Sequence, residues 1–245
     1  MTPSVEFFDA RALRLAEVAI PTLSPEERQA MDRFWDESVA IQPALFDGPA
    51  VACIEVDASG GELVLEWARV TYRYRALRSV KTCAWLPASV FVTVLQPVED
   101  GALIVGRSSA TTSYPGRWAL PGGSAEPPAP GETLDLAGLR RHAAQELVEE
   151  IGVAADPEGM TVWAVTRGEH GNIGVHFRAP TVPLALVLKH HEALVEEERA
   201  RGTGPELDQL AAVRSVDDLT ALGTCADFLP QVIARYAAHQ VNYLA

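Results

Sequence analysis

Three glutamates near the end of one predicted helix have the types and spacing to do chemistry. Glu146, Glu149 and Glu150 stand at i, i+3 and i+4, so an α-helix places their carboxylates on one face. Like charges at this spacing cost roughly 0.2–0.5 kcal/mol per pair, and the negative end of the helix dipole adds about 0.3–1 kcal/mol per charge. A solvated acidic patch is one interpretation. Clustered carboxylate oxygens are also the ligands that Mg²⁺ selects, and a divalent cation reverses the sign of the repulsion.

The segments that must position these carboxylates favour the metal-binding interpretation. A glycine-rich turn at 116–123 and a loop rich in proline and glycine at 124–132 come first. Gly152 fits the left-handed position just after the last helical turn. A second face of the predicted helix is apolar at helical spacing and is expected to pack inward; it comprises Leu136, Leu139, Ala143, Leu147 and Ile151.

The two motifs together resemble the signature of the Nudix hydrolases. The first reads Gly-X-Trp-X-Leu-Pro-Gly-Gly, and the second reads Glu-apolar-X-Glu-Glu-X-Gly-apolar. The match departs in the middle, because eight residues separate Gly123 from Glu132 and twelve separate Glu132 from Gln145, and both gaps are longer than in the family. A register that starts at Gly131 places Ala137 at the glutamate position and is less favoured. Gln145 also replaces the family's arginine.

The resemblance implies a Nudix α/β/α sandwich with a mixed sheet, and Mg²⁺ as the cofactor, with Mn²⁺ as a substitute. It implies that Glu146, Glu149 and Glu150 are metal ligands and that the backbone carbonyl of Gly123 completes the metal shell. The base that activates water is expected among Glu149, Glu150 and Glu206, although Glu206 is equally consistent with a solvated loop acid. Glu132 is interpreted as an architectural capping residue.

The N-terminal part is similar to that of the atypical Nudix UDP-glucose (UDP-sugar) pyrophosphatase. The similarity rests on Trp35, on Pro43-X-Leu45-Phe46-Asp47-X-Pro49 and on Thr71-Tyr72-Arg73. It implies that Gln145 is a subfamily trait. We therefore expect an N-terminal extension at 1–85, consisting of a helix and a β-hairpin, packed on a Nudix domain at 86–245.

Four residues are candidates for binding a nucleotide substrate: Arg107, Arg117, Tyr72 and Arg73. Arginine pairs bidentately with phosphate, and tyrosine stacks on a base or bonds a sugar hydroxyl. A salt bridge or a packed tyrosine is the alternative for each.

The leading functional hypothesis is hydrolysis of a nucleoside diphosphate sugar to a nucleoside monophosphate and a sugar 1-phosphate. ADP-ribose or a nucleoside triphosphate is an alternative substrate, and a non-catalytic nucleotide sensor is an alternative function. Isopentenyl diphosphate isomerase shares the family fold but requires a catalytic cysteine in its own motif. None of the three cysteines of this chain has that setting.

The amino-acid composition limits the kinds of partner and the compartment that we expect for this protein. The net charge of −13 argues against nucleic acid, because binding a phosphate backbone requires a basic surface. No apolar run approaches the length that spans a membrane, and the N-terminus lacks the features of a signal peptide, so we expect a cytoplasmic protein. Three widely spaced cysteines indicate neither a disulfide framework nor a zinc site. A homodimer is left open.

Hydrophobic periodicity and turn residues predict the elements. Residues 1–40 are predicted to be helical, with a capping box at Ser24-Pro25-Glu26-Glu27, and Ser59-Gly60-Gly61 is predicted to be a hairpin turn. Strands are predicted at 50–56, 63–70, 89–95, 103–107, 161–166, 173–178, 182–188 and 210–213, and further helices at 136–151, 189–201, 215–222 and 226–238.

Overall fold

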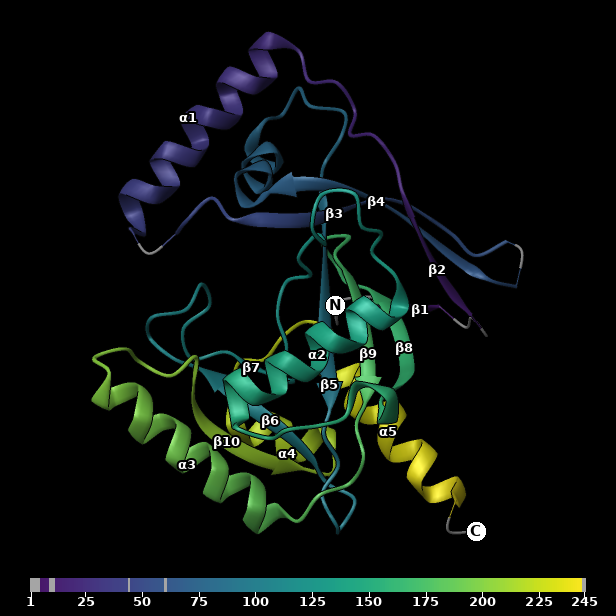
Figure 1. The fold of residues 1–245 in the computed structure, drawn as a ribbon, viewed down its shortest axis with the longest axis vertical. Helices are drawn as coiled ribbons and strands as arrows, with labels where there is room; N and C mark the ends of the chain where they lie inside the picture. The colour runs from purple at the N-terminus through teal and green to yellow at the C-terminus, as the bar shows by residue number, and fades with distance from the viewer. Residues whose placement is uncertain (1–4, 9–11, 44, 60, 244–245) are drawn as a thin grey trace.

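The chain folds into two β-sheets covered by helices. The structure is a computed structural model that describes residues 5–8, 12–43, 45–59 and 61–243, with side chains as far as residue 240 (Figure 1). A seven-stranded mixed sheet has the order β1-β8-β9-β5-β3-β4-β2, and a three-stranded sheet has the order β10-β6-β7.

The strands are β1 (Glu6–Phe8), β2 (Leu13–Glu17), β3 (Pro49–Asp57), β4 (Leu63–Thr71), β5 (Ala88–Leu95), β6 (Leu103–Ser108), β7 (Trp118–Ala119), β8 (Thr161–Arg167), β9 (Ile173–Arg178) and β10 (Leu207–Val213). The helices are α1 (Pro25–Ile41), α2 (Leu136–Ile151), α3 (Leu184–Ala200), α4 (Val216–Leu222) and α5 (Leu229–Tyr243). Two 3₁₀ segments are η1 (Tyr72–Ser79) and η2 (Pro157–Gly159).

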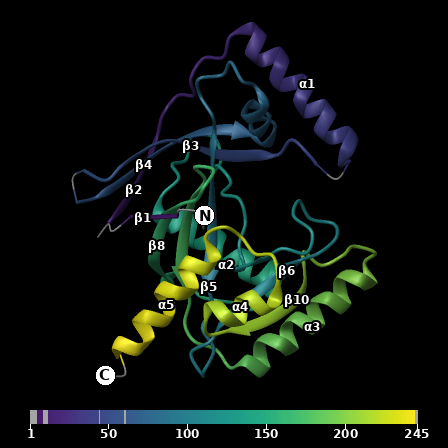
Figure 2. The same ribbon diagram turned by 180° about the vertical axis from the view of Figure 1, so that it is seen from behind.

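Helices cover both sides of the central strands. Alternate residues of β5 point to opposite faces, as the period of a strand requires. Val92 joins a core that contains the inner face of α2, whereas Leu95 joins a second core that contains residues of α4 and α5. Helix α2 lies in front of the central strands in Figure 1, and α4 and α5 lie in front in the reverse view of Figure 2. The predicted α/β/α arrangement with a mixed sheet is therefore confirmed.

The N-terminal residues build a separate small core but share the large sheet. β3 and β4 pair antiparallel as the predicted hairpin, β2 pairs parallel to β4, and β3 pairs with β5. Helix α1 and η1 pack together around Met31 and Leu77. Because the sheet runs across residue 85, the division at 85/86 stays a prediction. Gly60, in the predicted turn, lies outside the described residues.

Within the described part of residues 1–40, the prediction of helix is correct for α1 alone, and residues 1–4 and 9–11 lie outside the described residues. Ser24 caps this helix and Glu27 returns the capping hydrogen bond, which confirms the predicted capping box. Residues 6–8 and 13–17 form strands instead. Their backbones pair with β8 and β4, and these long-range hydrogen bonds override the weak local preference for a helix.

The predicted strand at 182–188 is wrong. Pro183 occupies the N-cap position of α3, and the helix already begins at Leu184. Val187, His191 and Val195 form its buried stripe at helical spacing. A short apolar run cannot by itself distinguish a buried strand from the first turns of a buried helix.

The loop before α2 is tied to the N-terminal strands by Arg69 on β4. The Arg69 guanidinium donates hydrogen bonds to the carbonyl oxygens of Pro128 and Glu132 and forms an ion pair with Glu17.

The capping role assigned to Glu132 is wrong, because Asp135 is the N-cap of α2 and accepts a hydrogen bond from the Gly138 amide. Glu132 is exposed and contributes its backbone carbonyl.

The three cysteines are free thiols, two of them buried, as expected for small apolar residues. In the part of the chain that the structure describes, every helix is too short or too polar to cross a bilayer.

A fully buried histidine joins β5, β8 and β9. His176 Nδ1 lies 2.7 Å from the Thr93 hydroxyl, and Nε2 lies 2.8 Å from the Thr166 hydroxyl. Phe91 and Phe228 pack against the ring. Burial lowers the pKa of His176 to about 3.

This pKa predicts that acid destabilises the protein. Below pH 6.5 the unfolded chain binds a proton at His176 that the folded state excludes, so stability is lost as the pH falls from 6.5 towards 3. The loss from this group is roughly 2 kcal/mol by pH 5. Urea unfolding of wild type and His176→Gln at pH 7.5 and pH 5 measures it, because the variant lacks the titration. The exposed His239→Gln variant is the control. A wild-type–variant difference that is the same at both pH values contradicts the prediction.

Candidate active site

The C-terminal end and the apolar face of helix α2 together set the direction in which its carboxylates point. Gly152 has a φ of 70°, so the predicted left-handed stop is confirmed. His190 on α3 donates a hydrogen bond from Nδ1 to the Gly152 carbonyl at 3.0 Å. The apolar face of α2 packs into the core as predicted, with Leu139 and Leu147 buried. The acidic face is therefore turned towards the glycine-rich turn.

Glu150 is buried rather than solvated. Its side chain is 7% exposed and accepts a hydrogen bond from the Gly122 amide at 2.6 Å. Burial, followed by the negative charge of Glu146 and weaker contributions from Glu206 and Glu149, raises the pKa of Glu150 well above its ordinary value. Burial and neighbouring negative charges both disfavour the ionised form of a carboxyl group, so both raise its pKa.

Gly122 can hold this position only because it has no side chain. Its φ is 146°, and an added Cβ would lie 2.2 Å from the Val92 carbonyl oxygen and 2.6 Å from Thr93 Cα. The adjacent Gly123 lies close to the end of a side chain rather than to backbone, because an added Cβ would lie 2.3 Å from Glu146 Oε1. The Gly-Gly pair thus lets the backbone approach two of the α2 carboxylates closely.

Glu146 also contacts His142, one helical turn earlier. His142 Nε2 lies 3.2 Å from Glu146 Oε1 and 3.0 Å from the Ser124 carbonyl. Burial by itself would lower the pKa of His142, but the hydrogen bond and charge of Glu146, the Ser124 carbonyl and the charge of Glu126 together raise it. His142 therefore links the helix to the residue after Gly123.

Gln145 takes part in the site, although the Nudix signature that the sequence resembles has arginine at this position. Its amide donates a hydrogen bond to Glu149 Oε1 at 2.7 Å. A neutral donor orients this exposed carboxylate without neutralising it. In the described residues, no arginine or lysine forms an ion pair with Glu146, Glu149 or Glu150.

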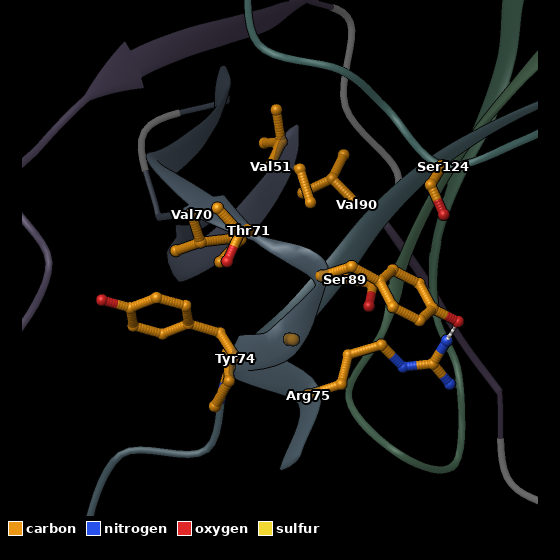
Figure 3. A pocket seen from close by; sticks show the side chains of 13 residues that line it. Val51, Val70, Thr71, Tyr74, Arg75, Ser89, Val90 and Ser124 are labelled. Carbon is orange, nitrogen blue, oxygen red and sulfur yellow. Dashed lines mark hydrogen bonds between the residues drawn. The ribbon is translucent and has the colours of Figure 1, made fainter. Parts of the chain in front are cut away.

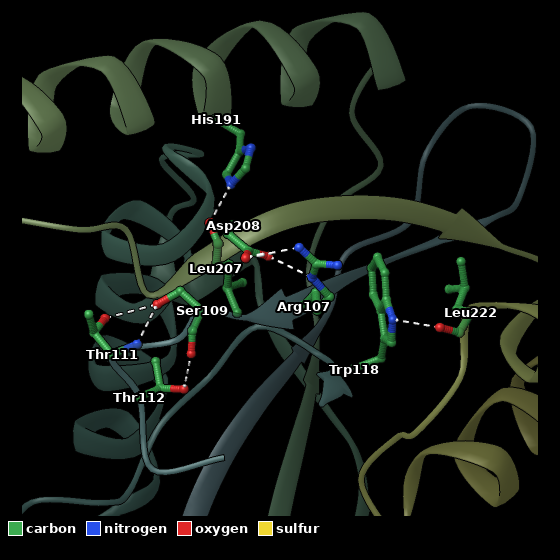
Figure 4. A network of polar contacts seen from close by, with 9 residues as sticks. All are labelled: Arg107, Ser109, Thr111, Thr112, Trp118, His191, Leu207, Asp208 and Leu222. Atoms are coloured by element: carbon green, nitrogen blue, oxygen red, sulfur yellow. Dashed lines mark hydrogen bonds and ion pairs between the residues drawn. The ribbon is translucent and has the colours of Figure 1, made fainter. Parts of the chain in front are cut away.

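Glu206 is brought to these carboxylates from the loop before β10. Partial burial, followed by the negative charges of Glu146, Glu149 and Glu198, raises the pKa of Glu206. Its backbone carbonyl accepts a hydrogen bond from the Ser109 amide at 2.8 Å. The next residue is held by His191 on α3, whose Nε2 donates to the Leu207 carbonyl at 2.9 Å (Figure 4).

Two of the four predicted substrate-binding residues are committed to ion pairs. Arg107 contacts Asp208 through two hydrogen bonds of 2.8 and 3.0 Å (Figure 4). Arg73 contacts Asp32 and Asp47 within the N-terminal part. Aspartates distant in sequence occupy both guanidinium groups, and the sequence carried no signal for these pairings.

Arg117 and Tyr72 lie in a different setting, together with two residues that the sequence did not single out. Arg117 lies over the Tyr114 ring, 3.9 Å from its centroid. Arg75 hydrogen-bonds the hydroxyl groups of both Tyr72 and Tyr114. Arg75 and Tyr114 were not anticipated because their contact depends on how a loop meets the N-terminal part.

The carboxylates do not form a ready-made coordination shell. Within the residues that the structure places, no set of three or more histidine, cysteine, aspartate or glutamate side chains is gathered closely enough to hold a metal ion as it stands. The metal-ligand and catalytic assignments stay predictions.

Comparisons with known proteins give weak similarity. No model of a protein family and no curated protein matches the sequence. The solved MutT protein of Methanosarcina mazei Go1 is 18% identical with a TM-score of 0.39, and the match covers 62% of this chain and 95% of that one. A Nudix hydrolase from M. smegmatis is 19% identical with a TM-score of 0.35, covering 63% and 86%. A bifunctional NMN adenylyltransferase/ADP ribose pyrophosphatase from Francisella tularensis, solved with AMP and a Mn ion, is 16% identical with a TM-score of 0.41, covering 68% and 45%.

Proposed function

We propose that this protein is a Mg²⁺-dependent Nudix pyrophosphohydrolase that cleaves a nucleoside diphosphate sugar of the UDP-glucose type. The products are a nucleoside monophosphate and a sugar 1-phosphate. The observation that carries the proposal is the packing of the α2 carboxylates against the Gly-Gly turn. The Gly122 amide donates to Glu150 at 2.6 Å, and an added Cβ on Gly123 would lie 2.3 Å from Glu146 Oε1. The charge of Glu206 adds to theirs. Such a concentration of negative charge is costly unless a cation or proton offsets it.

The residues present fit a hard divalent cation. Glu146, Glu149 and Glu150 supply carboxylate oxygens, and Gly123 approaches Glu146 so closely that a Cβ would occupy the same space. The Gly123 carbonyl accepts a hydrogen bond from the Val92 amide at 2.9 Å, which leaves its second lone pair. A bound Mg²⁺ would neutralise the diphosphate and stabilise the charge on its oxygens.

The chain's own residues then position and deprotonate water. Glu206 accepts a proton from water as the water oxygen bonds to phosphorus, and the bond from phosphorus to the bridging oxygen breaks. The bridging oxygen leaves with the departing phosphate. A raised pKa suits Glu206 to this task, because a base works best when its pKa lies near the working pH. The hydrogen bond from Gln145 keeps the Glu149 carboxylate oriented while negative charge moves to the leaving phosphate.

A substrate panel tests the proposal. We expect UDP-glucose to be hydrolysed in Mg²⁺ with a higher kcat/KM than ADP-ribose or ATP, with UMP and glucose 1-phosphate identified by chromatography. Preference for ADP-ribose or ATP would keep the hydrolase and replace the substrate. Tight nucleotide binding without turnover in Mg²⁺ or Mn²⁺ would favour a sensor, the function suggested by Gln145 and the long gap before α2.

A further inference from the structure

Two arginines and two tyrosines form a cluster where the N-terminal part meets the loop between β6 and β7. We call Tyr72, Arg75, Tyr114 and Arg117 the Arg–Tyr cluster. Arg75 lies over the Tyr72 ring at 4.7 Å and donates a hydrogen bond to the Tyr114 hydroxyl at 2.5 Å. Arg117 covers one face of Tyr114 at 3.9 Å. The tyrosine hydroxyls hold the Arg75 guanidinium in one orientation.

The positive charge of this cluster is not balanced by an ion pair with any of the described residues. In the described part of the chain, Arg75 and Arg117 form no ion pair with a carboxylate, whereas Arg69, Arg73 and Arg107 all do. Arg117 Nε is buried without a hydrogen-bond partner. In a protein with a net charge of −13, uncompensated guanidinium groups mark a place suited to an anionic ligand.

Two connections place the cluster beside the α2 carboxylates. Arg75 and Ser124 line the same pocket (Figure 3), and Tyr72 lines it as well. The Ser124 carbonyl lies 3.0 Å from the His142 ring that contacts Glu146. The space that a water-sized group can reach in this pocket is about 20 Å³, room for one such group, so a larger ligand must lie across its open side.

The second connection runs through the loop that carries Tyr114. The Ser108 amide donates to the Arg117 carbonyl at 2.9 Å and closes this loop. The Ser109 amide, at the start of the same loop, bonds the Glu206 carbonyl at 2.8 Å. The loop therefore joins the Arg–Tyr cluster to the candidate base.

We propose that the Arg–Tyr cluster is the subsite for the nucleoside diphosphate moiety of the ligand. The guanidinium groups of Arg75 and Arg117 contact phosphate oxygens, and Tyr114, which is 43% exposed, presents the rest of its ring to the base. This assignment rests on the proposed function of the carboxylate site and names residues that select its substrate. Tyr72 acts as a positioning residue, because it contacts Arg75.

Binding of a non-hydrolysable probe tests the subsite without turnover. The probe is α,β-methylene-UDP in Mg²⁺, measured by calorimetry on the full chain. We expect Arg75→Gln and Arg117→Gln to weaken binding roughly tenfold to a hundredfold, and Tyr114→Ala roughly tenfold. Arg33→Gln is the matched control, because Arg33 also lies over an aromatic ring, that of Phe34 at 5.2 Å.

Pyrophosphate as a second probe separates the two contacts. The arginine variants are expected to lose affinity for both probes, whereas Tyr114→Ala is expected to bind pyrophosphate within twofold of wild type. Since Tyr114 is exposed, this variant tests the subsite even if Arg75→Gln fails to fold.

The outcomes distinguish this inference from the proposed function. Turnover by wild type, with probe affinities within twofold in all three variants, would overturn the subsite and leave the hydrolase. Probe binding that depends on the cluster, with no turnover of any panel substrate, would leave the subsite and remove the hydrolase. Absence of probe binding by wild type at millimolar concentration would overturn the subsite.

Discussion

Replacing Glu149 with glutamine is expected to lower kcat/KM for UDP-glucose by roughly 10²–10³-fold, the range associated with loss of one group that helps to stabilise the charge of the transition state. Glu149 is an exposed carboxylate that receives a hydrogen bond from Gln145, and its charge raises the pKa of both Glu150 and Glu206. The substitution replaces one of the two carboxylate oxygens with an amide nitrogen and removes one negative charge, while it keeps the shape of the side chain. Initial rates across a Mg²⁺ titration measure the effect.

Stability separates this outcome from misfolding. Because the carboxylates repel one another, Glu149→Gln is expected to leave Tm unchanged or to raise it. Glu192→Gln, which removes a carboxylate from an exposed position on α3, serves as the control and is expected to keep wild-type activity. Undiminished hydrolysis by Glu149→Gln would contradict the proposed metal site.

Gly122→Ala is expected to destabilise the fold by about 2–6 kcal/mol, a large part of the stability of an ordinary domain. The backbone there has a φ of 146°, which costs L-residues about 1–3 kcal/mol, and the new methyl group meets the Val92 carbonyl oxygen at 2.2 Å. Relief of this clash moves the Gly122 amide away from Glu150, so activity is expected to fall as well. Urea unfolding and initial rates measure the two effects.

Gly116→Ala is the matched control. Gly116 also has a positive φ, 75°, but an added Cβ there meets no atom within 4 Å. We expect it to lose only roughly 1–2 kcal/mol, from backbone strain alone, with activity retained. Equal losses in the two variants would show that the close packing of Gly122 against β5 carries no energy.

Local signals were sufficient for the element that bears the carboxylates. The apolar spacing of Leu139, Ala143 and Leu147 fixed which face of α2 is buried, and Gly152 fixed where the helix ends. The capping box at Ser24 located the start of α1 in the same way. These features depend on residues within one or two helical turns, so a sequence alone can reveal them.

Two short segments, residues 13–17 and residues 184–188, were harder to assign from the sequence. Residues 13–17 become a strand because β4 offers a hydrogen-bonding edge, and residues 184–188 become helix because Val187 faces the core in register with His191. For residues 13–17 the partner strand is distant in sequence, and for residues 184–188 the core that Val187 enters is built from residues of distant elements. Glu132 does not cap α2 as the sequence predicted, because Asp135 is the N-cap residue of this helix.

The sequence by itself determined that three glutamates share one helical face beside a glycine-rich turn, since helical geometry and glycine conformations are local properties. Only the tertiary structure decided which of them is buried and that the charge of Glu206 acts on them. It also decided that Arg73 is paired with Asp32 and Asp47, whereas Arg75 has no carboxylate partner among the residues that the structure describes. Charge pairing and burial depend on contacts between residues far apart in the chain, and local spacing does not encode those contacts.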